Sequence, residues 1–193
     1  MEHKFNSANI DLDLKLLREF CEQEGEEVCY LKGERMESEG EPAHWFGFVT
    51  EGCFKYTARD TDNGKEHFTW CSFGDEFVGD YPAFINCSPA QTTIEAMLPS
   101  RVLRVSGEQL MQLFRLNMEM MELRAIIAEH LLGQARARYL DFHRTTARRR
   151  YELLMDRCRG IVELLNLQDI ASFLNVTPIY LSRIRKGITF GKR

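Results

Sequence analysis

Long apolar runs are missing from this sequence. No stretch approaches the roughly 18 consecutive apolar residues that a membrane-spanning helix requires. The first residues, Met1-Glu2-His3-Lys4, also lack the basic and then apolar pattern of a secretory signal peptide. We therefore expect a cytoplasmic protein with no membrane partner.

Cysteine pairing motifs are missing as well. None of the six cysteines belongs to a C-x-x-C pair: Cys21, Cys29, Cys53, Cys71, Cys87 and Cys158. In a reducing compartment such residues stay thiols, and cysteine is among the residue types most often buried. We expect several buried thiols rather than a disulfide framework, and oxidation of an exposed thiol stays open.

Catalytic arrangements are missing too. Four of the five histidines are scattered along the chain, at His44, His67, His130 and His143. The expected strands contain no His-x-His pair, the motif that would indicate a metal enzyme built on a barrel. The acidic side chains of Asp60, Asp62 and Glu66 surround an expected turn, and the stretch from Glu34 to Glu41 is predicted to be a solvated loop. We therefore expect neither catalytic residues nor a metal site, and no enzyme.

The charge is distributed unevenly. The formal net charge is −4, yet from Gln134 onward 13 Lys and Arg stand against 5 Asp and Glu, whereas the preceding part has 12 against 24. A polyanion such as nucleic acid would therefore meet only the basic end. A solvated basic helical surface would give the same count, so charge alone leaves both interpretations open.

Residues 26 to 105 have the texture of an antiparallel β-structure. We expect strands at 28–31, 45–49, 54–58, 67–71, 93–97 and 102–105, separated by frequent turn signals. Asn63-Gly64 predicts a tight hairpin because both residues tolerate positive φ. This spacing indicates a sandwich or barrel. A short amphipathic helix, Asp11–Glu24, capped by Asp11, is expected before it.

The sequence becomes helical after Ser106, which can cap a short helix in a capping box with Gln109. Asn117 then predicts the cap of a long helix that runs to about Phe142. Five residues recur along it at alternating steps of three and four and form a seam on one face: Met120, Leu123, Ile127, His130 and Gln134. We expect this helix to pack on the barrel and on a second copy, with the seam facing the partner. The alternative is intramolecular packing only.

A basic break from Thr145 to Arg150 predicts a hinge, and Tyr151–Cys158 predicts another helix. The most informative stretch follows, from Leu167 to Lys186. Ile170 and Leu174 give a first helix its apolar face, Ala171 is small where two helices must cross closely, and Asn175 can adopt the left-handed conformation that ends the helix.

Thr177 and Pro178 predict the start of a second helix, because threonine caps and proline needs no N–H at the first position. Leu181 and Ile184 are expected to face inward. The residues left on or near the outer face are candidate DNA contacts: Thr177, Ile179, Tyr180, Ser182, Arg183, Arg185 and Lys186. Arg183 is the best candidate to read a base, since a guanidinium pairs bidentately with guanine, and Arg185 and Lys186 fit phosphate contacts.

On this motif and on Gly74-Asp75-Glu76-Phe77-Val78-Gly79-Asp80, the chain from about Asp11 to Lys186 resembles the Crp/Fnr family of bacterial regulators. The resemblance implies an α+β fold with three parts. These are an N-terminal double-stranded β-helix (a jelly-roll-like β-roll, 1–115), a long dimerisation helix (116–144) and a C-terminal helix-turn-helix domain (145–193). It also implies a homodimer on a pseudo-palindromic duplex and contact with RNA polymerase. The segment from Arg159 to Asn166 is short for the β-hairpin of a winged domain.

The resemblance also implies an effector pocket, formed here by Gly79, Asp80, Gln91, Thr92 and Arg136. Relatives that bind cyclic AMP follow the glycine with a glutamate and place an arginine about ten residues on, against the cyclic phosphate. Here Asp80 is a shorter carboxylate, and 89–93 contains no cation. We therefore expect an unidentified small-molecule effector other than cyclic AMP, with Arg136 able to supply positive charge from the long helix.

Two redox alternatives within that family are weak. An iron–sulfur cluster needs four ligands, and the N-terminal pair Cys21 and Cys29 supplies two. Haem would have to use His67 or Cys71 on expected strands. The sequence thus predicts a DNA-binding transcription regulator. The alternative is a sensor or interaction module whose helix-turn-helix no longer binds DNA.

Overall fold

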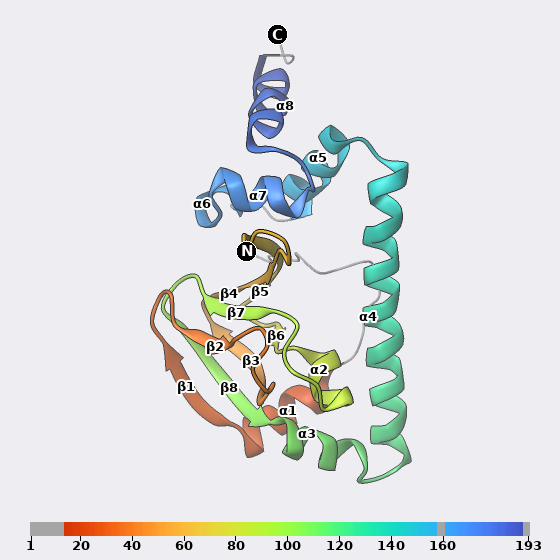
Figure 1. Ribbon diagram of the computed structural model, residues 1–193. Coiled ribbons are helices and arrows are strands. Elements are labelled where there is room, and N and C mark those ends of the chain that lie inside the picture. The colour runs from red at the N-terminus through yellow and green to blue at the C-terminus, as the bar shows by residue number, and fades with distance from the viewer. Residues whose placement is uncertain (1–13, 158–160, 191–193) are drawn as a thin grey trace.

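The computed structural model describes residues 14–157 and 161–190. A roll of β-strands lies at one end, a long helix runs along its side, and a small helical domain lies beyond the strands (Figure 1). This is the three-part architecture that the sequence predicts. None of the described helices combines the length and apolar character needed to span a membrane.

The roll consists of two four-stranded antiparallel sheets. One has the order β1 (Glu26–Tyr30), β8 (Ser100–Ser106), β3 (Trp45–Glu51) and β6 (Phe77–Val78), and the other has β2 (Arg35–Glu37), β7 (Thr93–Ala96), β4 (Cys53–Arg59) and β5 (Glu66–Phe73). Alternate side chains of both sheets point inward and form a core that includes Val49, Phe54, Ile94 and Val102. The predicted sandwich and its six expected strands are confirmed.

Three short elements of the roll are absent from the sequence prediction: β2, β6 and helix α2 (Tyr81–Asn86). The prediction of a solvated loop over Glu34–Glu41 is wrong at its centre, because Glu37 is only 5% exposed. Its carboxylate accepts hydrogen bonds from the backbone N–H of His44 (2.9 Å) and Trp45 (2.6 Å). Burial raises the pKa of Glu37 above its ordinary value, and these backbone donors oppose the rise.

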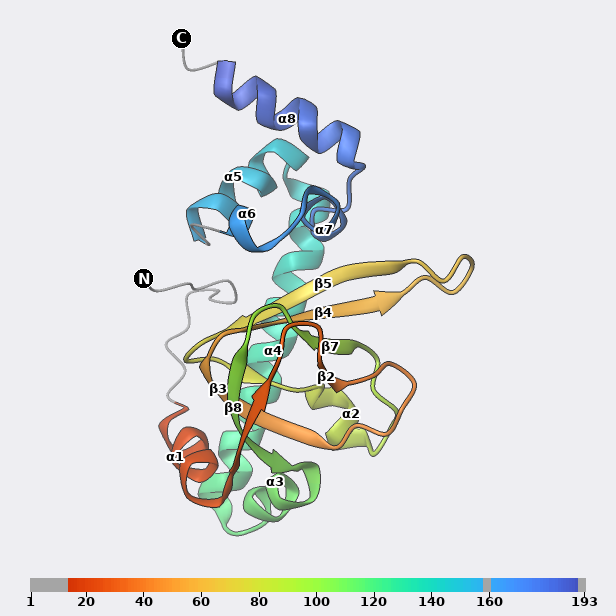
Figure 2. The ribbon, with the colours of Figure 1, turned by 90° about the vertical axis from the view of Figure 1, so that its left-hand side faces the viewer.

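The β4–β5 hairpin is closed by a side chain rather than by Asn63-Gly64 alone. Gly64 has positive φ (70°), but Asn63 does not. The Asp60 carboxylate accepts from the backbone N–H of Asp62 (2.8 Å) and Asn63 (3.2 Å), which lowers the pKa of Asp60. The hairpin that this loop closes extends beyond the other strands of the sheet (Figure 2).

Helix caps fix where the chain leaves the roll. Helix α1 covers Lys15–Glu24, and the predicted cap Asp11 lies outside the described residues. Helix α3 (Gly107–Phe114) begins in the predicted capping box of Ser106 and Gln109. Helix α4 (Met118–Arg144) begins at Asn117, whose side chain accepts from the backbone N–H of Met120 (2.9 Å). Both predicted caps are confirmed.

The helical domain comprises α5 (Ala147–Arg157), α6 (Ile161–Leu164), α7 (Leu167–Phe173) and α8 (Pro178–Phe190). The predicted break over 145–150 is wrong for its last four residues, because α5 already begins at Ala147. Only Thr145 and Thr146 separate α4 from α5. Within the described part of 145–193, no strand occurs that could form a wing. Cys158, predicted to end α5, lies outside the described residues.

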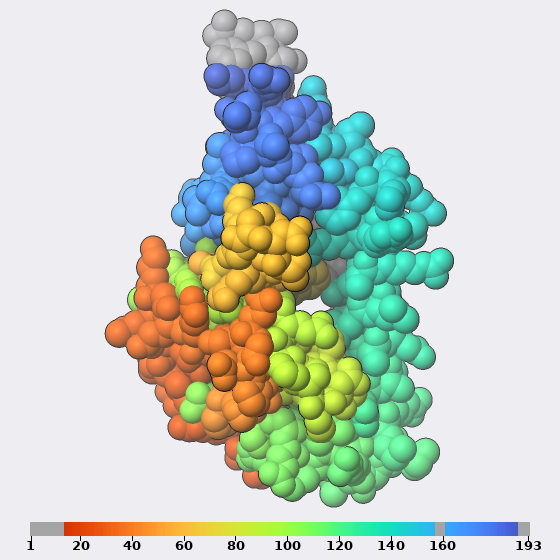
Figure 3. Space-filling model, viewed as in Figure 1, coloured from red at the N-terminus to blue at the C-terminus, as the bar shows by residue number. Residues whose placement is uncertain are grey.

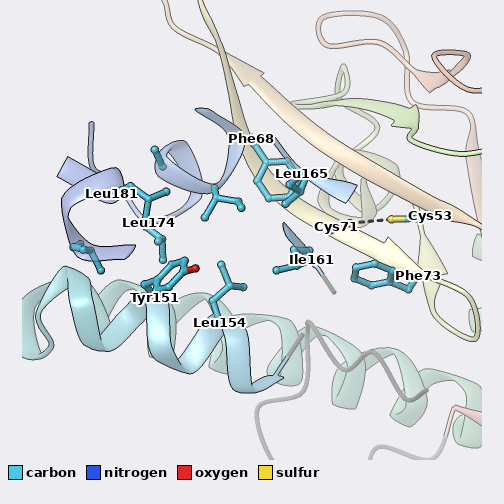
Figure 4. Packing of buried hydrophobic residues seen from close by; sticks show 13 residues of the cluster. Cys53, Phe68, Cys71, Phe73, Tyr151, Leu154, Ile161, Leu165, Leu174 and Leu181 are labelled. Atoms are coloured by element: carbon cyan, nitrogen blue, oxygen red, sulfur yellow. Dashed lines mark hydrogen bonds between the residues drawn. The ribbon is translucent and has the colours of Figure 1, made fainter. Parts of the chain in front are cut away.

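The helical domain packs on the roll. Figure 2 shows α7 next to β5, and Figure 3 shows side chains of the β4–β5 region (yellow to orange) pressed against the domain (blue). One hydrophobic cluster spans both parts. It joins Phe68 and Phe73 of β5 with Leu154, Ile161 and Leu165 of the helical domain (Figure 4). The domain is therefore positioned by the sensor-like roll as well as by α4.

Candidate nucleic-acid interface and effector pocket

The turn between α7 and α8 has the geometry that its residue types predict. Asn175 has φ 54°, in the left-handed region that asparagine tolerates. The backbone N–H of Val176 donates to the carbonyl of Ala171 (2.9 Å), and the Thr177 hydroxyl accepts from the backbone N–H of Tyr180 (3.2 Å). Helix α7 thus ends and α8 begins within four residues, as in a helix-turn-helix.

The inner and outer faces of the motif separate cleanly. The residues predicted to hold it together, Ile170, Ala171, Leu174, Leu181 and Ile184, are all buried. On the other face, Arg183, Arg185 and Lys186 are exposed, as are Thr177, Ile179 and Tyr180, and Ser182 is partly exposed. Helix α8 extends away from the roll at the far end of the molecule (Figure 1). Three cations therefore face solvent on one helix.

Asp80 occupies the centre of the predicted effector pocket. It is 6% exposed, and its carboxylate accepts from the backbone N–H of Gln91 (2.7 Å) and Thr92 (3.2 Å) and from the Thr92 hydroxyl (3.4 Å). Neighbouring Gly79 has φ 150°, and its N–H donates to the Tyr56 hydroxyl (3.0 Å). The structure thus brings Gly79, Asp80, Gln91 and Thr92 together, as predicted.

The chemistry of this pocket differs from that of an open anion site. Two adjacent backbone N–H groups could hold a phosphate, but here the carboxylate of Asp80 already takes both. The fifth predicted residue, Arg136, is exposed on α4, and no contact joins it to the other four in the described structure. Both backbone donors are therefore already paired with a side chain of the chain itself. Tyr56, which the sequence prediction missed, supports it from the neighbouring sheet.

The predicted partner-facing seam of α4 lies against the chain's own roll, which corrects the prediction. Met120, Leu123 and Ile127 are 6%, 7% and 7% exposed and belong to a cluster with α1, α3 and the roll. His130 and Gln134 continue this face, with their Nε2 atoms 2.7 Å apart. The roll takes these side chains because it offers the nearest apolar surface, so they are not available to a second copy.

A different seam of α4 is left exposed. Its residues recur at alternating steps of three and four: Met118, Met121, Ala125, Ala128, Leu132, Ala135 and Tyr139. All seven are exposed, and the four large ones are 54% to 77% exposed. This is the a/d spacing of a coiled coil. Below, the name "exposed α4 seam" refers to these seven residues.

Two guanidinium groups hold the C-terminal end of α7. Arg138 of α4 donates to the carbonyl oxygens of Thr69 in β5 and Phe173 in α7, and its guanidinium lies 4.0 Å from the centre of the Phe173 ring. Arg150 of α5 donates to the Leu174 carbonyl (3.1 Å). Carbonyls at the end of a helix carry partial negative charge, which favours cations there. Burial lowers the pKa of Arg138 to about 10, so the group is still charged at neutral pH.

The described cysteines are free thiols, several of them buried, as the sequence predicts. Cys21, Cys53 and Cys71 are buried, whereas Cys29 and Cys87 are exposed. Burial raises the pKa of the Cys21 thiol to about 12. Within residues 14–157 and 161–190, no group of three or more His, Cys, Asp and Glu side chains could hold a metal ion. His67, considered for haem, instead lies 3.2 Å (Nδ1) from the Ser172 hydroxyl of α7.

Comparisons with known proteins agree with this geometry. Residues 27–117 match the family model of the cyclic nucleotide-binding domain. Among solved structures, FixK2 from Bradyrhizobium japonicum matches with a TM-score of 0.70 at 24% identity, covering 86% of each chain. CLP from Xanthomonas campestris, a c-di-GMP responsive global regulator, matches at 0.67 and 16%, covering 93% of each chain. A mutant of CooA from Carboxydothermus hydrogenoformans matches at 0.67 and 15%, covering 96% of this chain and 87% of that one. No curated protein sequence matches the chain.

The family match and the order of the helices together define the architecture of the chain: a cyclic nucleotide-binding domain joined by a long helix to a helix-turn-helix domain. The fold is shared with FixK2, CLP and CooA, so the fold that the Crp/Fnr resemblance implies is confirmed.

Proposed function

We propose that the chain is a homodimeric, sequence-specific DNA-binding transcription regulator whose effector is not a cyclic nucleotide. The observation that carries the proposal is α8. It is capped by Thr177, held from behind by Leu181 and Ile184, and presents Arg183, Arg185 and Lys186 to solvent. A capped helix with a cationic outer face fits the major groove of a duplex.

The exposed residues of α8 fall into two groups, those proposed to contact bases and those proposed to contact phosphates. Arg183 lies near the centre of the exposed face, where a guanidinium can pair with guanine, and Ile179, Tyr180 and Ser182 flank it. Arg185 and Lys186 fit phosphate contacts, and Thr177 lies at the helix start, where its neighbouring N–H groups favour anions. The Crp/Fnr resemblance adds RNA polymerase as a further predicted partner. The duplex and the polymerase both place the protein in the cytoplasm.

A second copy is the occupant that we propose for the exposed α4 seam. Alanine at positions 125, 128 and 135 lets two parallel helices approach closely. Arg124 and Glu129 flank the seam five residues apart, so in a parallel pair Arg124 would face Glu129 of the partner subunit. Such a dimer carries two copies of α8. They would enter successive major grooves about 34 Å apart, which predicts a pseudo-palindromic site.

The test replaces one charge on α8. Arg183→Ala is expected to cost about 1–3 kcal/mol of specific binding and to relax the choice of base at one position. Arg115→Ala removes the same charge from an exposed position at the far end of α3 and is the matched control. Sites are first selected from random duplex, and affinity is then measured by fluorescence polarisation over a range of salt concentrations.

Failure would take a recognisable form. If the chain binds no duplex at low salt, or if Arg183→Ala and Arg115→Ala behave alike, the transcription-regulator proposal falls. The alternative would then stand: a sensor or interaction module whose helix-turn-helix does not dock on DNA.

A further inference from the structure

Three sulfur atoms meet where the roll joins the helical domain. The Cys53 and Cys71 Sγ atoms are 3.1 Å apart (Figure 4), and Met97 Sδ lies 3.7 Å from Cys53 Sγ and 3.9 Å from Cys71 Sγ. Cys53 comes from β4 and Cys71 from the neighbouring strand β5. Met97 directly follows β7, which pairs with β4 on its other side. The triangle is therefore fixed by three adjacent strands of one sheet.

We propose that this sulfur triangle is a binding site for a soft monovalent metal ion of the copper(I) type. Three sulfur ligands around one metal at about 2.3 Å lie about 4 Å apart. The two distances to Met97 already match that spacing, and the Cys–Cys distance needs a modest opening. Thiolate and thioether sulfur are the ligands that select copper(I) among biological metals.

The surroundings favour a metal of low coordination number. Cys53 is 1% and Cys71 is 0% exposed, and both belong to the hydrophobic cluster that includes Phe68, Phe73 and Ile161. Structural zinc sites prefer four nitrogen or sulfur ligands, and the three sulfur atoms here would leave a zinc ion without its fourth ligand. Among the described residues, no His, Asp or Glu completes a group with these two thiols.

Binding would exchange protons for metal without any change of oxidation state. The two thiols would lose their protons to solvent, and the thioether would bind unchanged, so that one Cu⁺ and two thiolates leave one net negative charge. Because two protons are released, affinity is expected to rise with pH.

The position of the site suggests a regulatory role, which rests on the proposed function. The cluster that holds Cys53 and Cys71 also contains Tyr151, Leu154 and Leu165 of the helical domain. A metal that spreads the Cys53 and Cys71 sulfurs to the spacing of metal ligands would move this contact surface and hence the seat of α7 and α8. Asp80 already takes the backbone donors of the predicted effector pocket, so the sulfur triangle offers the chain a different effector site.

The test titrates the full chain with copper(I) under anaerobic, reducing conditions against a chromogenic copper(I) chelator. We expect one ion per chain. Cys53→Ala and Cys71→Ala should each weaken binding by at least ~10-fold, since even outer-shell changes cost that much at metal sites. Met97→Leu keeps the apolar volume and should weaken binding by less. Cys29→Ala and Cys87→Ala remove exposed thiols and serve as controls.

Each result decides the question separately from DNA binding. The proposal is overturned if the chelator keeps all the copper, or if the control variants lose binding as much as Cys53→Ala and Cys71→Ala do. It is equally overturned if a mild oxidant joins the Cys53 and Cys71 thiols in a disulfide while copper does not bind, because the pair would then be a redox site. Should the alanine variants fail to fold, an unchanged affinity of Met97→Leu would contradict the three-sulfur site.

Discussion

At the scale of single residues, Asp80 decides what the roll can bind. Its carboxylate takes the backbone N–H groups of Gln91 and Thr92. Asp80→Ala would leave these partly buried donors without their acceptor, which costs up to about 1–3 kcal/mol of unfolding free energy. The same vacancy would accept an external anion. We therefore expect the variant to be less stable in urea and to be stabilised by inorganic phosphate, whereas the unmodified chain is not.

Asp80→Asn is the matched control, because the amide oxygen keeps an acceptor in place without the charge. It should retain more stability than Asp80→Ala and gain no phosphate response. Tight binding of cyclic AMP to the unmodified chain, measured by calorimetry, would contradict the view that Asp80 takes the donors of the pocket.

Residue types predicted much at this scale, and only three-dimensional contacts supplied the rest. The caps at Ser106, Asn117 and Thr177 and the left-handed Asn175 follow from local chemistry, so the sequence was sufficient. The sequence also grouped Asp80 with Gln91 and Thr92. It could not show that Asp80 points back at their N–H groups, because that depends on how two distant loops face each other.

At the scale of elements, α4 shows that one helix can carry two apolar stripes. The sequence predicted the helix, its cap and an apolar seam, but not which stripe the roll would cover. The cluster with Met120, Leu123 and Ile127 packs on the roll, and the exposed α4 seam is left for a partner. Elements as short as β2 and β6 were not predicted, because two or three residues give no readable periodicity.

The exposed α4 seam makes a prediction about assembly. Ala128→Glu places a charge at the centre of the seam, where a second helix would approach closely, and should convert a dimer to monomers at micromolar concentration. Ala137→Glu adds the same charge at an exposed position off the seam and should leave the dimer intact. Light scattering after size-exclusion chromatography measures both. Equal behaviour of the two variants, or a monomeric unmodified chain, would contradict the proposed dimer.

At the scale of the whole molecule, the helical domain is held to the roll by contacts between residues 35 to 105 positions apart. His67 meets Ser172, Phe68 lies against Phe173 with ring centres 5.8 Å apart, and Arg138 bridges β5 and α7. No local pattern announces such contacts, which is why the sequence predicted the parts but not how they dock.

Arg138 is the residue on which this docking depends most directly, because its guanidinium serves a strand, a helix end and an aromatic ring at once. Arg138→Met keeps the apolar stem but removes the donors, leaving two backbone carbonyls short of a partner. We expect amide hydrogen exchange to accelerate in α7 and around Thr69 in the middle of β5, while the core strands β3 and β8 keep their protection. Arg136→Met, two residues away and exposed, should leave exchange unchanged throughout. If Arg138→Met speeds exchange uniformly over the whole chain, the guanidinium supports global stability rather than the seat of the helical domain. If it speeds exchange nowhere, the hydrophobic cluster alone holds the two parts together.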